Sequence, residues 1–264
     1  MIRLAERTWP EAARLAADPR SVVLLPLGAI EQHGPHLPLL VDWLGAEQLA
    51  RRVAPHLRHA GFRPVVLPGL PYGVSPLARG FAGTIGLSTR TLVAIVTEII
   101  RALRTQGFRR FVLTNYQADP AHLAAMARIK RRLESRGGVR VLFAGFGPTP
   151  RAQRAMTDAR VMRLLRSPAP AREWHAGELE TALVLATCPW LVRRAVARRL
   201  PPHWIDVPAA LRARRTFRQM DPSGRGYFGW PAAARATTGR RALALRARLL
   251  ARAVLAELGA PVRT

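Results

Sequence analysis

Residues 22–38 read Val22-Val23-Leu24-Leu25-Pro26-Leu27-Gly28-Ala29-Ile30-Glu31-Gln32-His33-Gly34-Pro35-His36-Leu37-Pro38, an apolar run that gives way to a polar loop. The apolar part predicts a buried strand. Glu31 and His33 lie two positions apart just after it, so they share one side of an extended segment. Together with Asp42, they offer carboxylate and imidazole ligands that suit Zn²⁺, Mn²⁺ or Fe²⁺. The alternative is a loop with incidental polar residues, in which Asp42 caps the following helix.

Strand and helix signals alternate along the rest of the chain. Predicted strands cover residues 22–27, 64–67, 111–114 and 139–144, and predicted helices cover residues 44–57, 88–107, 121–136, 178–187 and 238–258. Residues 145–172 form a long proline-containing excursion with room for one short helix, and residues 191–235 look irregular. This alternation predicts an α/β fold in which a mostly parallel sheet carries helices on both faces. Because we find no repeat and no boundary, we expect one domain over residues 1–264.

The formal charge of +26 raises the possibility of a nucleic-acid partner. Lys130 is the single lysine, however, so the excess is almost entirely arginine, and the arginines are scattered along the chain. Charged runs of this kind usually belong to solvated helix faces. We therefore expect a basic but solvated surface and no nucleic-acid partner.

Cysteine content and hydropathy favour a cytoplasmic protein. Cys188 is the only cysteine, so no disulfide can form within the chain, as is usual in a reducing compartment. No apolar run reaches the length needed to cross a bilayer, and the first residues lack the apolar core of a signal peptide. We expect no membrane partner.

Two further segments carry candidate site residues. In His175-Ala176-Gly177-Glu178-Leu179-Glu180-Thr181, an apolar stretch follows Glu180, which favours an inward-pointing carboxylate that needs a partner such as a cation. The alternative is a surface helix start, where acidic residues complement the helix dipole. In Thr114-Asn115-Tyr116-Gln117-Ala118-Asp119-Pro120, the residues alone favour a helix start capped by Asp119.

These segments together resemble the creatininase (creatinine amidohydrolase) family. Residues 28–38 and Asp42 match its opening Gly-x-x-Glu-Gln-His-Gly-Pro-His-Leu-Pro pattern and the aspartate that follows. Phe81-Ala82-Gly83-Thr84 is similar to the family's Phe-Pro-Gly-Thr element. Residues 175–181 are similar to its His-Ala-Gly-x-x-Glu-Thr element, and residues 226–231 are similar to a late Gly-x-x-Gly-x-Pro element. The resemblance extends from about residue 9 to residue 239.

The resemblance implies a three-layer α/β/α fold and metal-dependent hydrolysis of a C–N bond in a cyclic amide, a formamide or a short peptide. It implies one or two divalent ions (Zn, Mn or Fe), with Glu31 and Asp42 holding one and His33 and Asp42 the other. His175 corresponds to a residue that handles protons or contacts substrate, and Glu180 to a ligand or base. The family also implies a homo-oligomer, with a hexamer as one form.

The chain departs from the family after the third predicted strand. The family normally has Asn-Gly-His there, whereas this chain has Asn115-Tyr116-Gln117, so Gln117 occupies the position of a ligand histidine. Asp119 occupies the position of a metal-binding glutamate in one form of the motif. A glutamine amide is a poor ligand for Zn²⁺, so this substitution is expected to weaken one metal site.

Three interpretations remain open at this point. The chain is an enzyme with one metal on His33, Asp42 and either Asp119 or Glu180, or it is an enzyme with two metals and a different substrate. The third possibility is a divergent protein that binds a ligand or acts as a scaffold without turnover. In the enzyme interpretations, we expect the substrate contacts to include Ser75, Tyr116 and Trp174.

Overall fold

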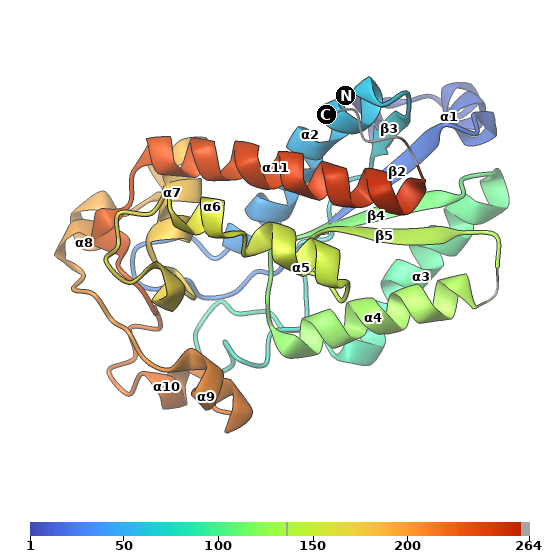
Figure 1. The fold of residues 1–264 in the computed structure, drawn as a ribbon. Coiled ribbons are helices and arrows are strands. Elements are labelled where there is room, and N and C mark those ends of the chain that lie inside the picture. The colour runs from blue at the N-terminus through green and yellow to red at the C-terminus, as the bar shows by residue number, and fades with distance from the viewer. Residues whose placement is uncertain (136, 260–264) are drawn as a thin grey trace.

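The computed structural model describes residues 1–135 and 137–259 and contains a parallel sheet (Figure 1). Its strands are β1 (Ile2–Arg3), β2 (Ser21–Leu27), β3 (Arg63–Val66), β4 (Arg110–Asn115) and β5 (Arg140–Gly145). Their order across the sheet is β1-β3-β2-β4-β5, and every pairing between neighbours is parallel. The strand predicted from the opening stretch is thus one of the central strands and is buried along its whole length.

Helices cover both faces of the sheet and complete three layers. The longer ones are α1 (Trp9–Ala17), α2 (Val41–His59), α3 (Thr89–Gln106), α4 (Pro120–Glu134), α7 (Glu178–Thr187) and α11 (Ala236–Leu258). Alternate side chains of β2 face opposite ways, with Val22 and Leu24 in the core under α2 and α11, and Val23 and Leu25 in the core under α3 and α4. This arrangement confirms the predicted α/β/α architecture.

Short helices fill the segments that lacked a clear periodic pattern. They are α5 (Pro150–Met156), α6 (Ala159–Met162), α8 (Arg194–Arg199), α9 (Val207–Arg212) and α10 (Phe217–Met220), with 3-10 turns at Leu4–Glu6, Pro170–Arg172, Pro189–Leu191 and Pro231–Ala233. The prediction of one short helix in residues 145–172 is wrong, because that segment holds both α5 and α6. The irregular segment 191–235 likewise contains three short helices, which are too short to show helical periodicity.

Other differences lie at the edges of the elements. β1 and α1 were not predicted, although Thr8 and Glu11 form a capping box that marks the start of α1. The helix over 88–107 is confirmed, with Ser88 as N-cap and Gly107 directly after its end. Residue 136, the predicted end of α4, lies outside the described residues.

The connections between strands define a crevice at the carboxyl ends of β2 and β4. The chain leaves β2 for β3 on one side of the sheet, then returns to β4 and β5 on the other side. Ligands bind in parallel sheets at such a reversal of strand order. Figure 1 shows that α7, α9 and α10 gather beyond this end of the sheet.

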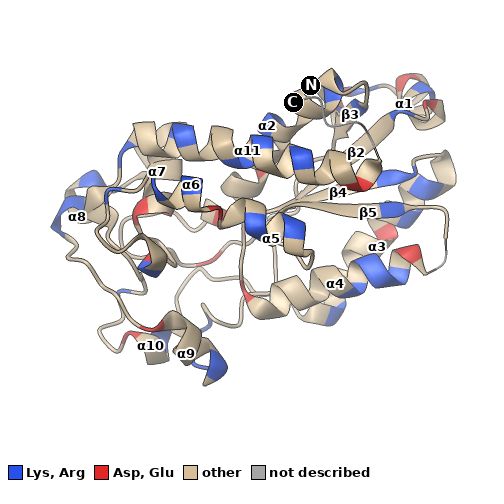
Figure 2. Cartoon of the chain, in the orientation of Figure 1, with Lys and Arg blue, Asp and Glu red and all other residues tan. Residues whose placement is uncertain are grey.

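The charged residues are distributed as the sequence suggests. Figure 2 shows basic positions dispersed over the outer helices rather than collected along one element. Among the described residues, no helix combines the length and the apolar character that crossing a bilayer requires.

Candidate metal centre

The loop after β2 is fixed by hydrogen bonds from segments that also match the family motifs. The Glu31 backbone N–H donates to the Leu39 carbonyl oxygen (2.9 Å), and the Gln32 N–H donates to Thr84 Oγ1 (3.1 Å). Thr84 belongs to the Phe-Ala-Gly-Thr element, whose role here is to hold this loop. The loop therefore presents its side chains toward the crevice from a constrained backbone.

His33 lies at the centre of the polar cluster and is completely buried. Its Nδ1 is 3.1 Å from the Glu31 carbonyl oxygen, which can only accept, so Nδ1 carries the proton of the neutral ring and Nε2 is the nitrogen that can bind a metal. Nε2 lies 3.6 Å from Asp42 Oδ1 and 3.8 Å from Glu180 Oε2. Both distances are too long for hydrogen bonds, and Nε2 has no hydrogen-bond partner.

This geometry fits a divalent cation. Two ligand atoms at about 2.1 Å from a tetrahedral metal lie about 3.4 Å apart, close to the spacing of His33 Nε2 from the two carboxylates. One ligand atom from each of His33, Asp42 and Glu180 lies within 4.8 Å of the other two. Asp42 Oδ2 is also buried without a partner. Buried polar atoms are normally hydrogen-bonded, so these unsatisfied atoms favour a bound ion.

The first turn of α2 places Asp42 in the cluster. The N-cap of α2 is Leu40, and Asp42 lies inside the helix, so the alternative in which Asp42 is an ordinary cap is wrong. Glu180 lies in the first turns of α7 and accepts a hydrogen bond from the Ala176 N–H (2.5 Å), which fixes its carboxylate. The two carboxylates thus approach His33 from two different helices.

The cluster is electrostatically unfavourable without a cation. Burial, reinforced by the Asp42 carboxylate, raises the pKa of Glu31 to about 8, and burial raises the pKa of Glu180 to about 6. Burial alone lowers the pKa of His33, but Asp42, Glu180 and Glu31 outweigh it and raise that pKa to about 10. A bound cation would neutralise the crowded carboxylates in their ionised form.

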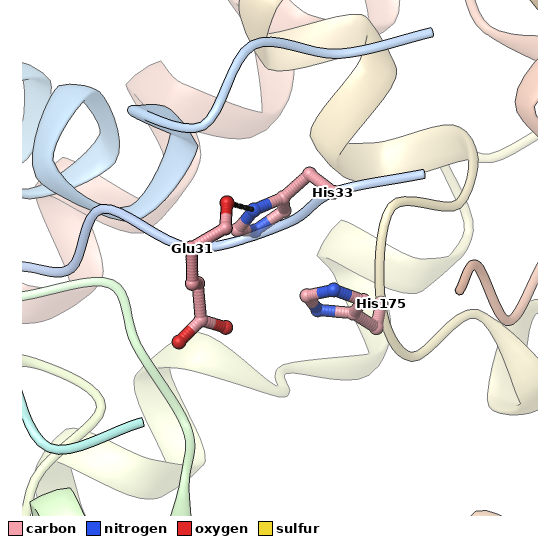
Figure 3. A group of neighbouring side chains, drawn as sticks. All are labelled: Glu31, His33 and His175. Carbon is pink, nitrogen blue, oxygen red and sulfur yellow. Dashed lines mark hydrogen bonds between the residues drawn. The ribbon is translucent and has the colours of Figure 1, made fainter. Parts of the chain in front are cut away.

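His175 adds a second imidazole beside His33. The two ring centroids are 4.4 Å apart, and the other face of His175 stacks on Phe217 at 4.3 Å. Figure 3 shows Glu31, His33 and His175 grouped around one space, and one ligand atom from each lies within 4.8 Å of the other two. Burial holds the pKa of His175 well below its usual value, so the ring is neutral near pH 7.

Gln117 and Asp119 follow β4 and face the same crevice. The Gln117 side-chain nitrogen donates to Glu31 Oε2 (2.8 Å), so the two residues lie in contact. Asp119 is the N-cap of α4: its Oδ1 accepts from the Ala121 N–H (2.8 Å), and its Oδ2 accepts from the Leu77 N–H (3.1 Å). Both carboxylate oxygens of Asp119 are thereby engaged by backbone groups.

A substitution separates the capping role of Asp119 from a metal role. Asp119→Ala should lower the free energy of unfolding by about 0.5–2 kcal/mol, the usual cost of losing an N-cap, and should leave the metal content per chain unchanged. Urea denaturation and elemental analysis of the same preparation test this. A folded variant that has lost its metal would contradict the capping assignment.

A cavity of about 360 Å³ opens from the cluster. Its polar end is formed by Glu31, Asp42, Gln117, His175 and Glu180, and most of the remaining wall is apolar: Leu77, Phe146, Met156, Met162, Leu179, Val207, Leu211, Phe217 and Phe228. The volume is within the roughly 300–1,000 Å³ usual for ligand pockets.

Two of the three predicted substrate contacts line the cavity, and Ser75 is not among its lining residues. Trp174 is 44% exposed and lines the cavity, and Tyr116 is buried in its wall. The Tyr116 ring packs on Gly45 of α2. A Cβ at position 45 would lie 2.3 Å from the ring, so tyrosine at position 116 requires glycine at position 45. Ser75 is buried and accepts a hydrogen bond from the Gln117 side chain (3.0 Å).

Arg246 is a component of the cavity wall that the sequence did not indicate. This α11 residue is 3% exposed and donates from Nε (3.0 Å) and Nη2 (2.8 Å) to the Met156 carbonyl oxygen, and from Nη1 (2.7 Å) to Tyr116 Oη. Phe217, which stacks on His175, was likewise not predicted. The available signal for Arg246 was its position on the apolar stripe of α11, between Leu243 and Leu250.

Comparisons with known proteins agree with this geometry. The family model for creatininase (creatinine amidohydrolase) matches residues 5–254. A creatinine amidohydrolase of Pseudomonas putida is 38% identical over 117 residues, 42% of this chain and 43% of that protein, so the match spans under half of the relative's length. A mycofactocin precursor peptide peptidase of Mycobacterium tuberculosis is 30% identical over 84% of this chain and 80% of its own.

Solved structures extend the similarity over nearly the whole fold. A creatinine amidohydrolase (creatininase) superposes with a TM-score of 0.73 at 28% identity, covering 97% of each chain. Similar creatininases are described as a Zn-Zn form (TM-score 0.73, 28% identity, 97% of each chain) and an Mn form (0.72, 27%, 97% of this chain and 98% of that chain). The metal-ligand geometry, the family model and the shared fold together show that this chain belongs to the creatininase family.

Proposed function

We propose that this protein is a metal-dependent amidohydrolase that cleaves a C–N bond of a small amide or a short peptide. The observation that carries the proposal is the group of His33, Asp42 and Glu180, whose ligand atoms have cation spacing. His33 Nε2 and Asp42 Oδ2 have no other partner. Carboxylate and imidazole ligands suit Zn, Mn or Fe. A cation bound there would polarise the amide carbonyl and lower the pKa of water.

The surrounding residues supply the remaining requirements of amide hydrolysis. Attack by water releases a proton, and expulsion of the amine requires one on the leaving nitrogen. We assign this transfer to His175, whose neutral ring accepts the proton from the attacking water and then donates it to the leaving nitrogen. Its ring is neutral, lines the cavity and stacks between His33 and Phe217, so its position is fixed. Its Nε2 lies 2.9 Å from the Gln32 carbonyl oxygen, which holds the imidazole in one orientation.

The cavity lining favours a substrate with an apolar portion next to the scissile amide. Aromatic and aliphatic side chains such as Phe217 and Leu179 extend from the polar cluster toward the exposed Trp174. The names of two similar proteins describe one as acting on creatinine, a small cyclic amide, and the other on a precursor peptide. We place the substrate among cyclic amides, formamides and short peptides, with the apolar wall favouring the larger ones.

We also propose that the protein is cytoplasmic and forms a homo-oligomer, with a hexamer as one form. Support for association comes from large apolar side chains on the surface of the single chain: Trp9 is 82% exposed and Trp190 is 73% exposed. Light scattering of the purified protein measures the oligomeric state directly.

The test of function combines metal analysis with an amide panel. Protein purified without chelators should contain bound Zn, Mn or Fe. It should release amine from at least one cyclic amide, formamide or apolar peptide, as followed by mass spectrometry. Chelator-treated protein should be inactive and should recover when the metal is returned.

Two controls define the outcomes of that test. Glu98→Gln on the exposed surface of α3 should leave metal content and turnover unchanged. Glu180→Gln should lower both, since it weakens one proposed ligand. Folded protein without metal would refute the proposal. Bound metal without turnover of any panel member would favour the non-catalytic, ligand-binding alternative.

A further inference from the structure

The side-chain amide of Gln117 is oriented by three acceptors. Its Nε2 lies 2.8 Å from Glu31 Oε2, 3.0 Å from Ser75 Oγ and 3.1 Å from the Val74 carbonyl oxygen. The Val74 carbonyl oxygen can only accept a hydrogen bond, so the NH₂ end of the amide, and not its oxygen, faces Val74 and Glu31. This end of the amide carries the partial positive charge.

The amide has little freedom to turn over. The Gln117 backbone N–H donates to Asn115 Oδ1 (3.1 Å), and Asn115 Nδ2 donates to the Gln117 carbonyl oxygen (2.7 Å). Gln117 Oε1 lies beside Gly73, where an added Cβ would be only 2.7 Å from it. A rotation by 180° would place Oε1 against the Glu31 carboxylate and lose the bond to Val74. The orientation therefore follows from the whole set of contacts.

The Glu31 side of the centre consequently lacks ligands for an ion of its own. The position that carries an imidazole in the family presents N–H groups here, and these repel a cation. Asp119 does not compensate, because among the described residues it belongs to neither group of closely spaced ligand atoms, and backbone N–H groups orient its two oxygens toward Leu77 and Ala121. The Gln117 amide instead occupies the place beside Glu31 that a second cation would take.

Two overlapping groups of side chains compete for His33. The first contains Asp42 and Glu180, and the second contains Glu31 and His175. Since Nδ1 of His33 is bound to a carbonyl oxygen, its Nε2 is the single nitrogen available to either group. In the second group, Glu31 is engaged by Gln117, and His175 Nε2 lies 2.9 Å from the Gln32 carbonyl oxygen. The first group offers two carboxylates and is the stronger site.

We infer that this chain binds a single divalent cation, on His33, Asp42 and Glu180, and that the Gln117 amide takes the place of a second. The inference rests on the proposed function, since both require the first cation. It differs from the two-ion arrangement described for the Zn-Zn creatininase. It assigns Gln117 a positioning role, in which its amide holds the Glu31 side chain facing the cavity without binding metal.

Metal stoichiometry tests the inference without an activity assay. The full chain is equilibrated with Zn²⁺ or Mn²⁺, desalted, and analysed for metal per chain. Wild type should hold one ion, Gln117→His should hold two, and the control Gln106→His, at the exposed end of α3, should hold one. With Mn²⁺, the wild-type electron paramagnetic resonance spectrum should be that of an isolated ion. The spectrum of Gln117→His should show coupling between two ions.

Each outcome has a definite consequence. Two ions in wild type, or a single ion in a folded Gln117→His variant, would overturn this inference and leave the proposed function standing. No bound ion in wild type would overturn both. If Gln117→His does not fold, Gln117→Glu has the same length and adds a carboxylate ligand. It is likewise expected to hold two ions, and one ion in that variant would overturn the inference.

Discussion

Asp42→Asn should remove the bound metal and abolish amide hydrolysis while the fold persists. Asp42 is 3% exposed, its Oδ1 lies 3.6 Å from His33 Nε2, and its Oδ2 has no other partner. Asparagine keeps the shape but removes the negative charge and one ligand oxygen. Loss of an outer partner of a metal ligand already costs about 10–100-fold in affinity, so loss of this direct ligand should cost more than about 100-fold.

Competition with a metal-binding dye measures the affinity, and mass spectrometry of the released amine measures the rate. Asp42 has like-charged neighbours in Glu31 and Glu180, and it makes no hydrogen bond that supports α2. The circular dichroism spectrum of the variant should therefore match that of metal-free wild type. Glu98→Gln, an acid-to-amide change on exposed α3, should retain both metal and rate. An Asp42→Asn protein with normal metal content would place the cation elsewhere.

The sequence was sufficient for the architecture because the strands are strongly apolar and the helices carry end signals. Residues 178–187 form a helix as predicted, and Ser88 and Gly107 mark both ends of α3. β1 has two residues, too few for any periodic pattern. The short helices between residues 145 and 235 are formed through tertiary contacts rather than by their own periodicity.

The sequence motifs indicate which residues belong to the candidate site, but they do not indicate how those residues are hydrogen-bonded. His33 joins Asp42 and Glu180 in one group of closely spaced ligand atoms, and Glu31 and His175 in another. The direction of the Gln117 amide depends on Val74 and Ser75, which belong to a different segment, so residue type alone could not reveal it. The engagement of both Asp119 oxygens depends in the same way on the backbone of Leu77.

The high arginine content made Arg246, a buried residue of the cavity wall, hard to identify from the sequence. Many arginines of α11 are exposed, so a buried one does not stand out by residue type. Its spacing does, because Leu243, Arg246 and Leu250 follow the buried stripe of the helix. The composition suggests that the arginines are solvated, whereas the helical spacing of Arg246 with Leu243 and Leu250 indicates that Arg246 is buried.

Arg246→Met should destabilise the protein more than any surface arginine substitution. The guanidinium caps the end of α5 through the Met156 carbonyl oxygen and also donates to Tyr116 Oη. Methionine fills much of the volume but leaves both buried acceptors without a donor, at about 1–3 kcal/mol each. Relief from burying a charge offsets part of this cost. We expect a net loss of about 2–4 kcal/mol in the free energy of unfolding.

Thermal and urea denaturation of metal-loaded protein measure this effect. At about 2–4 °C per kcal/mol for a chain near this size, the midpoint should fall by roughly 4–16 °C. Arg248→Met is the matched control, because Arg248 is exposed on the same helix and its loss should change stability by less than about 0.5 kcal/mol. Equal stability of the two variants would mean that the buried guanidinium contributes no net stabilisation. In that case the hydrogen bonds from Arg246 would not be needed to hold the end of α5 and Tyr116 in place. Apolar packing alone would then hold the cavity wall that these two form.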